Sequence, residues 1–212
     1  MDILNASDKD FRKKLQAITS RGEADTSKVE DAVKEIITGI RRHGDKALFS
    51  YTNRFDGLSL DKKTIRVSDA EFAGARKAVS KDIVESLKLA AKRIEAFHRR
   101  QLEESWFFHE DDGVTLGQMV RPLERVGAYV PGGKATYPSS VLMNVIPAKV
   151  AGVKEVIVCS PTPGGEVNPY VLVAAEIAGA DAVYKVGGAQ AVAAMAYGTP
   201  SIPRVDKIVG PG

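Results

Sequence analysis

Four short apolar runs in the second half of the chain constrain the fold more than any other feature. They occupy residues 126–130, 156–159, 182–186 and 207–209, and helical patterns lie between successive runs. Parallel strands need crossover connections of a dozen or more residues, usually a helix. Right-handed crossovers place helices on both faces of such a sheet. The sequence therefore predicts a parallel α/β sheet built from these runs.

The first half of the chain predicts mainly helices. Apolar residues at helical spacing indicate a short helix capped by Ser7 or Asp8, and a longer one that follows residues 25–27 and ends at Gly44. A long amphipathic helix is predicted over about 81–104. Further elements are predicted by local signals: a strand at 64–67, a capping box at 68–71, a hairpin of 106–109 with 114–120, and a helix at 139–151 that Pro147 bends or divides.

These elements give an α/β fold class: a helical N-terminal region followed by an incomplete Rossmann-like βαβ parallel-sheet domain. The pattern changes near Pro122. We therefore expect an N-terminal helical arm at residues 1–22, a first and incomplete α/β domain at 23–122, and the sheet domain at 123–212.

Composition excludes several classes of protein. Cys159 is the single cysteine, so no internal disulfide forms and a reducing compartment is expected. The net charge of +3 gives little attraction for nucleic acid. No apolar run has the length of a signal-peptide core or a membrane span. We expect a cytoplasmic protein with neither a nucleic-acid nor a membrane partner.

Glycine-rich turns follow the predicted strands and indicate a small-molecule site. The first turn contains Gly132, Gly133 and Lys134, the second contains Gly187 and Gly188, and a third begins at Gly210. Ligands of parallel sheets bind beyond the carboxyl ends of the strands, and glycine permits close approach. Neither the P-loop nor the dinucleotide G-x-G-x-x-G spacing is present. Phosphoryl transfer on the first turn is thereby excluded, and tight turns that only join strand to helix remain the alternative.

Three side chains near these turns have two interpretations each. Tyr129 either stacks on a ligand or is a half-buried strand aromatic. Gln190 either contacts the polar groups of a nucleotide or is an exposed first-turn residue. Cys159 is either a nucleophile or, as we favour, a buried inert thiol. The three histidines are scattered, so the residues alone predict neither a metal site nor a catalytic group.

Five ordered segments resemble the histidinol dehydrogenase family: residues 121–134, 137–152, 156–161, 186–191 and 205–212. The resemblance implies a zinc-dependent homodimer that uses NAD. It implies oxidation of L-histidinol to L-histidine through an aldehyde, the last step of histidine biosynthesis. It also implies incomplete Rossmann-like α/β units.

Within these motifs, Tyr129 and Gln190 match NAD-contacting positions, and we assign Gly132, Gly133, Gly187 and Gly188 to the same cofactor site. The family's zinc ligands, its Glu-His base pair and an asparagine that contacts the cofactor all lie farther along the chain than Gly212. We therefore expect no catalytic or metal residue here, an N-terminal fragment that is inactive alone, and an uncovered apolar surface. The alternative is a non-catalytic nucleotide- or partner-binding module.

Overall fold

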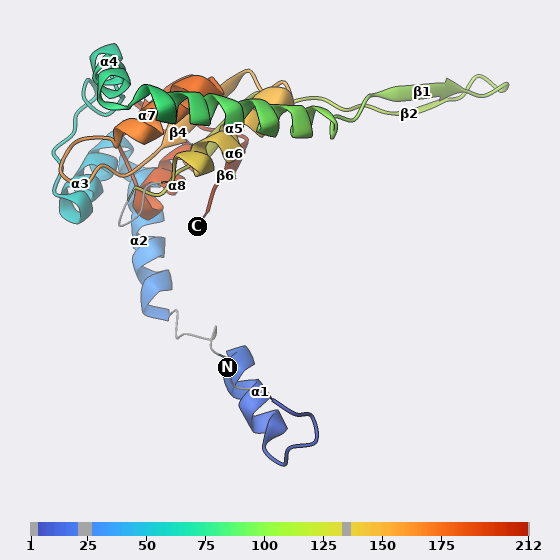
Figure 1. The fold of residues 1–212 in the computed structure, drawn as a ribbon, viewed down its shortest axis with the longest axis horizontal. Coiled ribbons are helices and arrows are strands. Elements are labelled where there is room, and N and C mark those ends of the chain that lie inside the picture. The colour runs from blue at the N-terminus through green and yellow to red at the C-terminus, as the bar shows by residue number, and fades with distance from the viewer. Residues whose placement is uncertain (1–3, 21–26, 133–136, 212) are drawn as a thin grey trace. The chain divides into compact units, whose positions relative to one another are not determined.

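The computed structural model describes residues 4–20, 27–132 and 137–211, which form α1 to α8 and β1 to β6 (Figure 1). Two compact units divide the chain, Met1–Glu35 and Ile36–Gly212. The first unit contains α1 (Phe11–Thr19) and the beginning of α2 (Ser27–His43). The domain boundaries predicted at residues 22 and 122 stay predictions.

Caps were predicted for both helices that begin in the first unit, α1 and α2. Asp10 occupies the N-cap position of α1 without a side-chain cap, so the cap predicted at Ser7 or Asp8 is wrong. None of the α1 residues is buried, and no packing fixes where this helix begins. Of the cap predicted at residues 25–27, residues 25 and 26 lie outside the described residues, and residue 27 is the first residue of α2.

The second unit contains a four-stranded parallel sheet with the order β5-β4-β3-β6. In register, Gly127 of β3 lies between Ile157 of β4 and Ile208 of β6. The sheet confirms the predicted strands, although β5 ends two residues earlier than expected. Its members are β3 (Arg125–Tyr129), β4 (Glu155–Cys159), β5 (Ala182–Tyr184) and β6 (Lys207–Val209).

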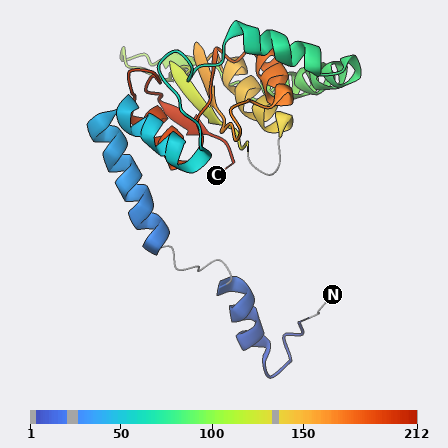
Figure 2. The same ribbon diagram turned by 90° about the vertical axis from the view of Figure 1, so that its left-hand side faces the viewer.

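Helices cover both faces of this sheet, as Figure 2 shows. Alternate residues of a strand point to opposite faces, so Val156 and Val158 pack in one core while Ile157 and Cys159 pack in the other. The first core includes α4 (Asp69–Ala78), α5 (Lys81–Arg99), α6 (Pro138–Val150) and α7 (Pro169–Ala178). The second includes the end of α2, α3 (Asp45–Asp56) and α8 (Gly188–Tyr197). Pro147 lies inside α6, which is one helix rather than two.

The strand order reverses direction beside β3. The chain runs from β3 through α6 to β4 and through α7 to β5, and α8 then returns it to β6 on the other side of β3. In open α/β sheets, ligands bind at such a reversal, outside the carboxyl ends of the strands. The topology therefore directs attention to the ends of β3 and β6.

The segment predicted as a strand at 64–67 is not one. Only Arg66 forms an isolated antiparallel bridge, with Tyr184 at the outer edge of β5. The Asp61 carboxylate accepts the backbone N–H groups of Lys63 and Thr64 and holds a turn just before the bridge. The confirmed capping box of Ser68 and Glu71 begins α4 just after it. Too few residues remain between the two features for a longer strand.

The predicted hairpin is confirmed by β1 (Trp106–His109) and β2 (Thr115–Gln118), which pair in antiparallel fashion and extend away from the sheet (Figure 1). Every residue of the two strands is exposed. The preceding helix, α5, ends at Arg99, five residues before the predicted end. Among the described helices, none is both long and apolar enough to cross a bilayer. Exposed apolar side chains of the hairpin and its flanks are Leu102, Trp106, Phe107, Phe108, Val114, Leu116, Met119, Val120 and Leu123.

Candidate site at the carboxyl edge of the sheet

The loops that follow β3, β4, β5 and β6 lie at one edge of the sheet, because the four strands are parallel. We call this edge, with Tyr129, Gly132, Gly187, Gly188 and Gln190, the carboxyl-edge site. Gly133 and Lys134, which the sequence also indicated, lie outside the described residues. The structure thus places the described part of both glycine turns at the same edge.

A direct hydrogen bond joins the first glycine turn to the second. The backbone N–H of Gly188 donates to the hydroxyl oxygen of Tyr129 across 3.1 Å. Tyr129 is the last residue of β3 and half-buried, and Gly188 is the first residue of α8. The phenol accepts in this bond and keeps its own O–H free to donate to another group. This bond therefore places a hydroxyl donor beside the positive end of a helix dipole.

The glycines at 132 and 187 both face Pro161, in the loop after β4. A Cβ atom on Gly132 would overlap the Pro161 carbonyl oxygen, and one on Gly187 would overlap the Pro161 side chain. Pro161 is thus wedged between the two turns. Close packing accounts for glycine at both positions, as the tight-turn interpretation predicted, whether or not a ligand also approaches.

Gln190 is buried, with an exposed fraction of 2%, so the interpretation as an exposed first-turn residue is wrong. Its side chain turns back on Gly188, where an added Cβ would lie 2.7 Å from Oε1 of Gln190. Gly188 itself has a φ of +63°, which favours glycine. The amide of Gln190 is therefore held against the start of α8 rather than in solvent.

Gly210 is a site residue that the sequence analysis did not assign. It follows β6 with a φ of +138°, and a Cβ there would overlap the carbonyl oxygen of Tyr129. The signal was present in the third glycine turn, but contact with Tyr129 depends on β6 lying beside β3. Gly210 brings the end of β6 against the same tyrosine that bonds Gly188.

Two buried side chains lie at the end of β4 and in the loop that follows it: Cys159 is the last residue of the strand, and Thr162 lies three residues further on. Complete burial raises the pKa of the Cys159 thiol to about 12, so it is protonated near neutral pH and is not a nucleophile. This agrees with the inert thiol that we favoured. The Thr162 hydroxyl is also buried and has no hydrogen-bond partner. Neither residue offers reactive chemistry, and within the described ranges no group of three or more His, Cys, Asp or Glu residues is placed to hold a metal ion.

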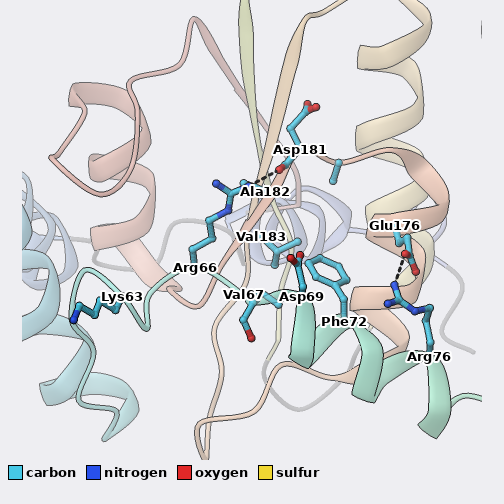
Figure 3. A pocket seen from close by; sticks show the side chains of 12 residues that line it. Lys63, Arg66, Val67, Asp69, Phe72, Arg76, Glu176, Asp181, Ala182 and Val183 are labelled. Atoms are coloured by element: carbon cyan, nitrogen blue, oxygen red, sulfur yellow. Dashed lines mark hydrogen bonds and ion pairs between the residues drawn. The ribbon is translucent and has the colours of Figure 1, made fainter.

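A cavity of about 690 Å³ lies elsewhere, at the beginning of β5 and beside α4 and α7 (Figure 3). Three cationic side chains line it, but three acidic ones line it too: Lys63, Arg66 and Arg76 against Asp69, Glu176 and Asp181. Arg66 donates to the Asp181 carbonyl oxygen at 3.0 Å, and Arg76 pairs with Glu176. Its charges are thus largely balanced within the protein, and no net field selects a ligand.

Fold and topology together define a Rossmann-like α/β protein with a candidate ligand site at the carboxyl edge of its sheet. The histidinol dehydrogenase family model matches residues 19–212. This chain belongs to that family.

Individual relatives agree. A histidinol dehydrogenase of Syntrophotalea carbinolica is 58% identical over 212 residues, covering 100% of this chain and 49% of the relative. One of Pseudomonas aeruginosa is 52% identical over 212 residues, covering 99% of this chain and 48% of the relative. The crystal structure of histidinol dehydrogenase from Elizabethkingia anophelis superposes with a TM-score of 0.81 at 39% identity, over 87% of this chain and 42% of that one. The chain spans about half the length of the curated relatives it matches.

Proposed function

We propose that this chain supplies the NAD-contacting part of an enzyme that oxidises L-histidinol to L-histidine through an aldehyde. The proposal is carried by the hydrogen bond from Gly188 to Tyr129, which joins two glycine turns at the reversal point of a parallel sheet. Tyr129 and Gln190 are assigned to contact NAD, with Gly132, Gly133, Gly187 and Gly188 in the turns around it. NAD supplies the hydride acceptor for the two oxidation steps.

The described residues suit the polar part of a dinucleotide. The ten-residue helix α8 begins at Gly188, and helix N-termini favour anionic groups such as a pyrophosphate. The free O–H of Tyr129 provides a donor beside it, and the Gln190 amide is ordered before any ligand binds. An ordered contact residue loses less conformational entropy on binding. These side chains would bind and orient the cofactor, and none of them is placed to remove the substrate proton.

Zinc and a proton-accepting base belong to the same proposal, but the described residues hold no cluster that would bind the metal, so its ligands are assigned to residues outside them. We also propose that the full-length enzyme is a cytoplasmic homodimer. The exposed apolar hairpin supports association, since contiguous apolar patches often mark interfaces. Sedimentation velocity of a full-length protein that contains this chain would test it, because a monomer at micromolar concentration would contradict the homodimer.

A chimaera tests the proposed reaction. The chain would replace the matching half of the Syntrophotalea carbinolica relative, with which it is 58% identical. We expect NADH formation from L-histidinol, with Tyr129→Ala raising the KM for NAD at least as much as it lowers kcat. The matched control is Tyr170→Ala, because Tyr170 is an exposed tyrosine on α7. A folded chimaera that binds NAD with no effect of Tyr129→Ala would contradict the site assignment.

Titration with NAD distinguishes the alternative function, a non-catalytic nucleotide-binding module, from the proposed enzyme. Calorimetric titration of the 212-residue chain with NAD would show tight binding abolished by Tyr129→Ala if the module were the function. Weak binding of NAD, together with an active chimaera, supports the enzyme. NADH formation from histidinol by the 212-residue chain alone would contradict our assignment of the metal and proton chemistry to residues outside it.

A further inference from the structure

A partly buried ion pair lies directly before the second glycine turn. Lys185 follows β5 and has an exposed fraction of 8%. Its Nζ lies 2.9 Å from Oε1 of Glu71, in the first turn of α4. Burying a charged group is costly unless it is paired, and removing one partner leaves the other uncompensated. The pair therefore constrains where Lys185 can lie.

Glu71 is itself held in place by a second set of contacts. Its Oε2 accepts hydrogen bonds from the Ser68 backbone N–H and the Ser68 hydroxyl, both at 2.8 Å. Burial alone would raise the pKa of Glu71, but the hydrogen bonds from Ser68 and Lys185 outweigh it and lower the pKa. The carboxylate is thus a fixed anchor, with one oxygen on the cap of α4 and the other on Lys185.

The backbone beside Lys185 is fixed from both sides. The Lys185 N–H donates to the Ile65 carbonyl at 2.8 Å, and the preceding Tyr184 carbonyl accepts the Ser160 N–H at 3.1 Å. The next residue, Val186, is fully buried in the core that contains α8. Lys185 and Val186 therefore anchor opposite faces of the segment that enters Gly187 and Gly188.

We infer that Glu71 and Lys185 form a positioning pair for the cofactor turn at Gly187 and Gly188. The pair connects α4 to the segment that sets where the Gly188 N–H meets Tyr129. Neither side chain is assigned to touch the ligand. This inference rests on the proposed function, because the turn is taken to be part of an NAD site.

Glu71→Gln and Lys185→Met are the test variants. Glutamine also serves at the third helical position of a capping box, so Glu71→Gln keeps the cap and removes the ion pair. Ser68→Ala is the converse control, because it removes the hydroxyl from the cap but leaves Glu71 bonded to Lys185 and to the backbone N–H of residue 68. Lys149→Met is the matched ion-pair control. Lys149 bonds Asp181 at 2.6 Å, directly before β5 and at the opposite end of that strand from Lys185.

NAD affinity is measured by calorimetry, and amide hydrogen exchange of residues 186–190 is measured by NMR in the 212-residue chain. We expect about threefold to tenfold weaker NAD binding in Glu71→Gln and Lys185→Met. This is the loss of affinity that corresponds to the entropic cost of ordering a loop or side chain on binding. Exchange in the turn should accelerate in the same two variants. The double variant should bind no more weakly than the worse single one. The two controls should lose stability without either change.

Unchanged affinity and exchange in Glu71→Gln and Lys185→Met would overturn the inference, as would equal losses in the controls. The two proposals fail separately. If neither the wild-type chain nor the wild-type chimaera binds NAD, the cofactor assignment fails, while the exchange rates still decide whether the pair holds the turn. If the wild-type chain binds NAD and the variants bind it equally well, the positioning role fails and the cofactor assignment stands.

Discussion

The hydroxyl oxygen of Tyr129 accepts the backbone N–H of Gly188 at 3.1 Å, although 59 residues separate the two in sequence. The bond joins the end of β3 to the beginning of α8. Gly210 packs against the carbonyl oxygen of the same tyrosine. Tyr129 is therefore the residue on which the turns after β3, β5 and β6 converge.

Tyr129→Phe tests this convergence with the smallest change. It deletes the hydroxyl and keeps the ring, so the Gly188 N–H loses its acceptor. A hydrogen bond of this kind contributes about 0.5–1.5 kcal/mol, so unfolding free energy should fall by no more than that. NAD affinity should fall roughly threefold to tenfold. Urea unfolding and calorimetry measure the two effects, and an unchanged NAD affinity would show that the Tyr129 hydroxyl does not contribute to NAD binding.

Gln190→Leu separates contact from packing. Leucine retains most of the side-chain volume at this buried position but lacks the amide. If the amide meets the cofactor, NAD binding should weaken roughly tenfold, as the loss of one good hydrogen bond implies. Val192→Ala, at an exposed position of the same helix, is the control and should bind NAD as the wild type does. Equal NAD binding by Gln190→Leu and the control would show that Gln190 only supports the turn.

Gly187→Ala should destabilise the protein, because the new Cβ overlaps the Pro161 side chain. Overpacking of this kind costs about 1–3 kcal/mol. Gly74→Ala is the matched control: Gly74 lies in α4 with no heavy atom within 4 Å of the added Cβ. That control should gain about 0.5–1 kcal/mol from helix propensity. A Gly187→Ala protein as stable as wild type in urea would contradict the close packing of Pro161 against Gly187.

Cys159 should resist alkylation in the folded protein. Its burial raises the thiol pKa to about 12, so almost no thiolate exists at pH 8. Iodoacetamide followed by mass spectrometry should label the unfolded chain fully and the native chain only at the rate of unfolding. Cys159→Ala should retain NAD binding. Rapid stoichiometric labelling of the native protein would show that the thiol is more accessible and more acidic than the structure implies.

The Glu71 pair should make stability depend on pH in the acidic range. The folded-state pKa of Glu71 lies below its ordinary value of 4.5, so its contribution is complete above 4.5 and is lost as pH falls through the folded-state pKa. The stability difference between wild type and Glu71→Gln should therefore be constant at neutral pH and shrink at acidic pH. Urea unfolding across pH 3–7 measures it. A difference that grows on acidification would reverse the sign of the assigned shift.

Local patterns in the sequence were enough to predict the four strands of the parallel sheet, the hairpin and the cap of α4. Each depends on residues close together, such as Ser68 with Glu71. The strand predicted at 64–67 was wrong although apolar and polar residues alternate there. The turn held by Asp61 and the beginning of α4 leave too few residues between them for a strand. A short alternating pattern carries no information about such competing local hydrogen bonds.

The site was less predictable, because its contacts join distant segments. The sequence indicated Tyr129 and both glycine turns. Predicting that Pro161 packs between Gly132 and Gly187 would have required knowledge of the order of β3, β4 and β5 in the sheet. The burial of Gln190 and the contact of Gly210 with Tyr129 required the placement of α8 and β6. Residue patterns placed the turns at strand ends, and only the folded sheet showed which of them meet.

NMR titration of the isotopically labelled chain with NAD tests the central claim most directly. We predict that NAD shifts the backbone amides of residues 128–132 and 186–190, with Gly188 among the largest changes, and leaves the hairpin residues 106–118 unshifted. NADH should shift the same amides. Shifts confined to the hairpin or to the cavity beside α4 would contradict a cofactor site at the carboxyl edge of the sheet, as would the absence of NAD binding by both this chain and the chimaera.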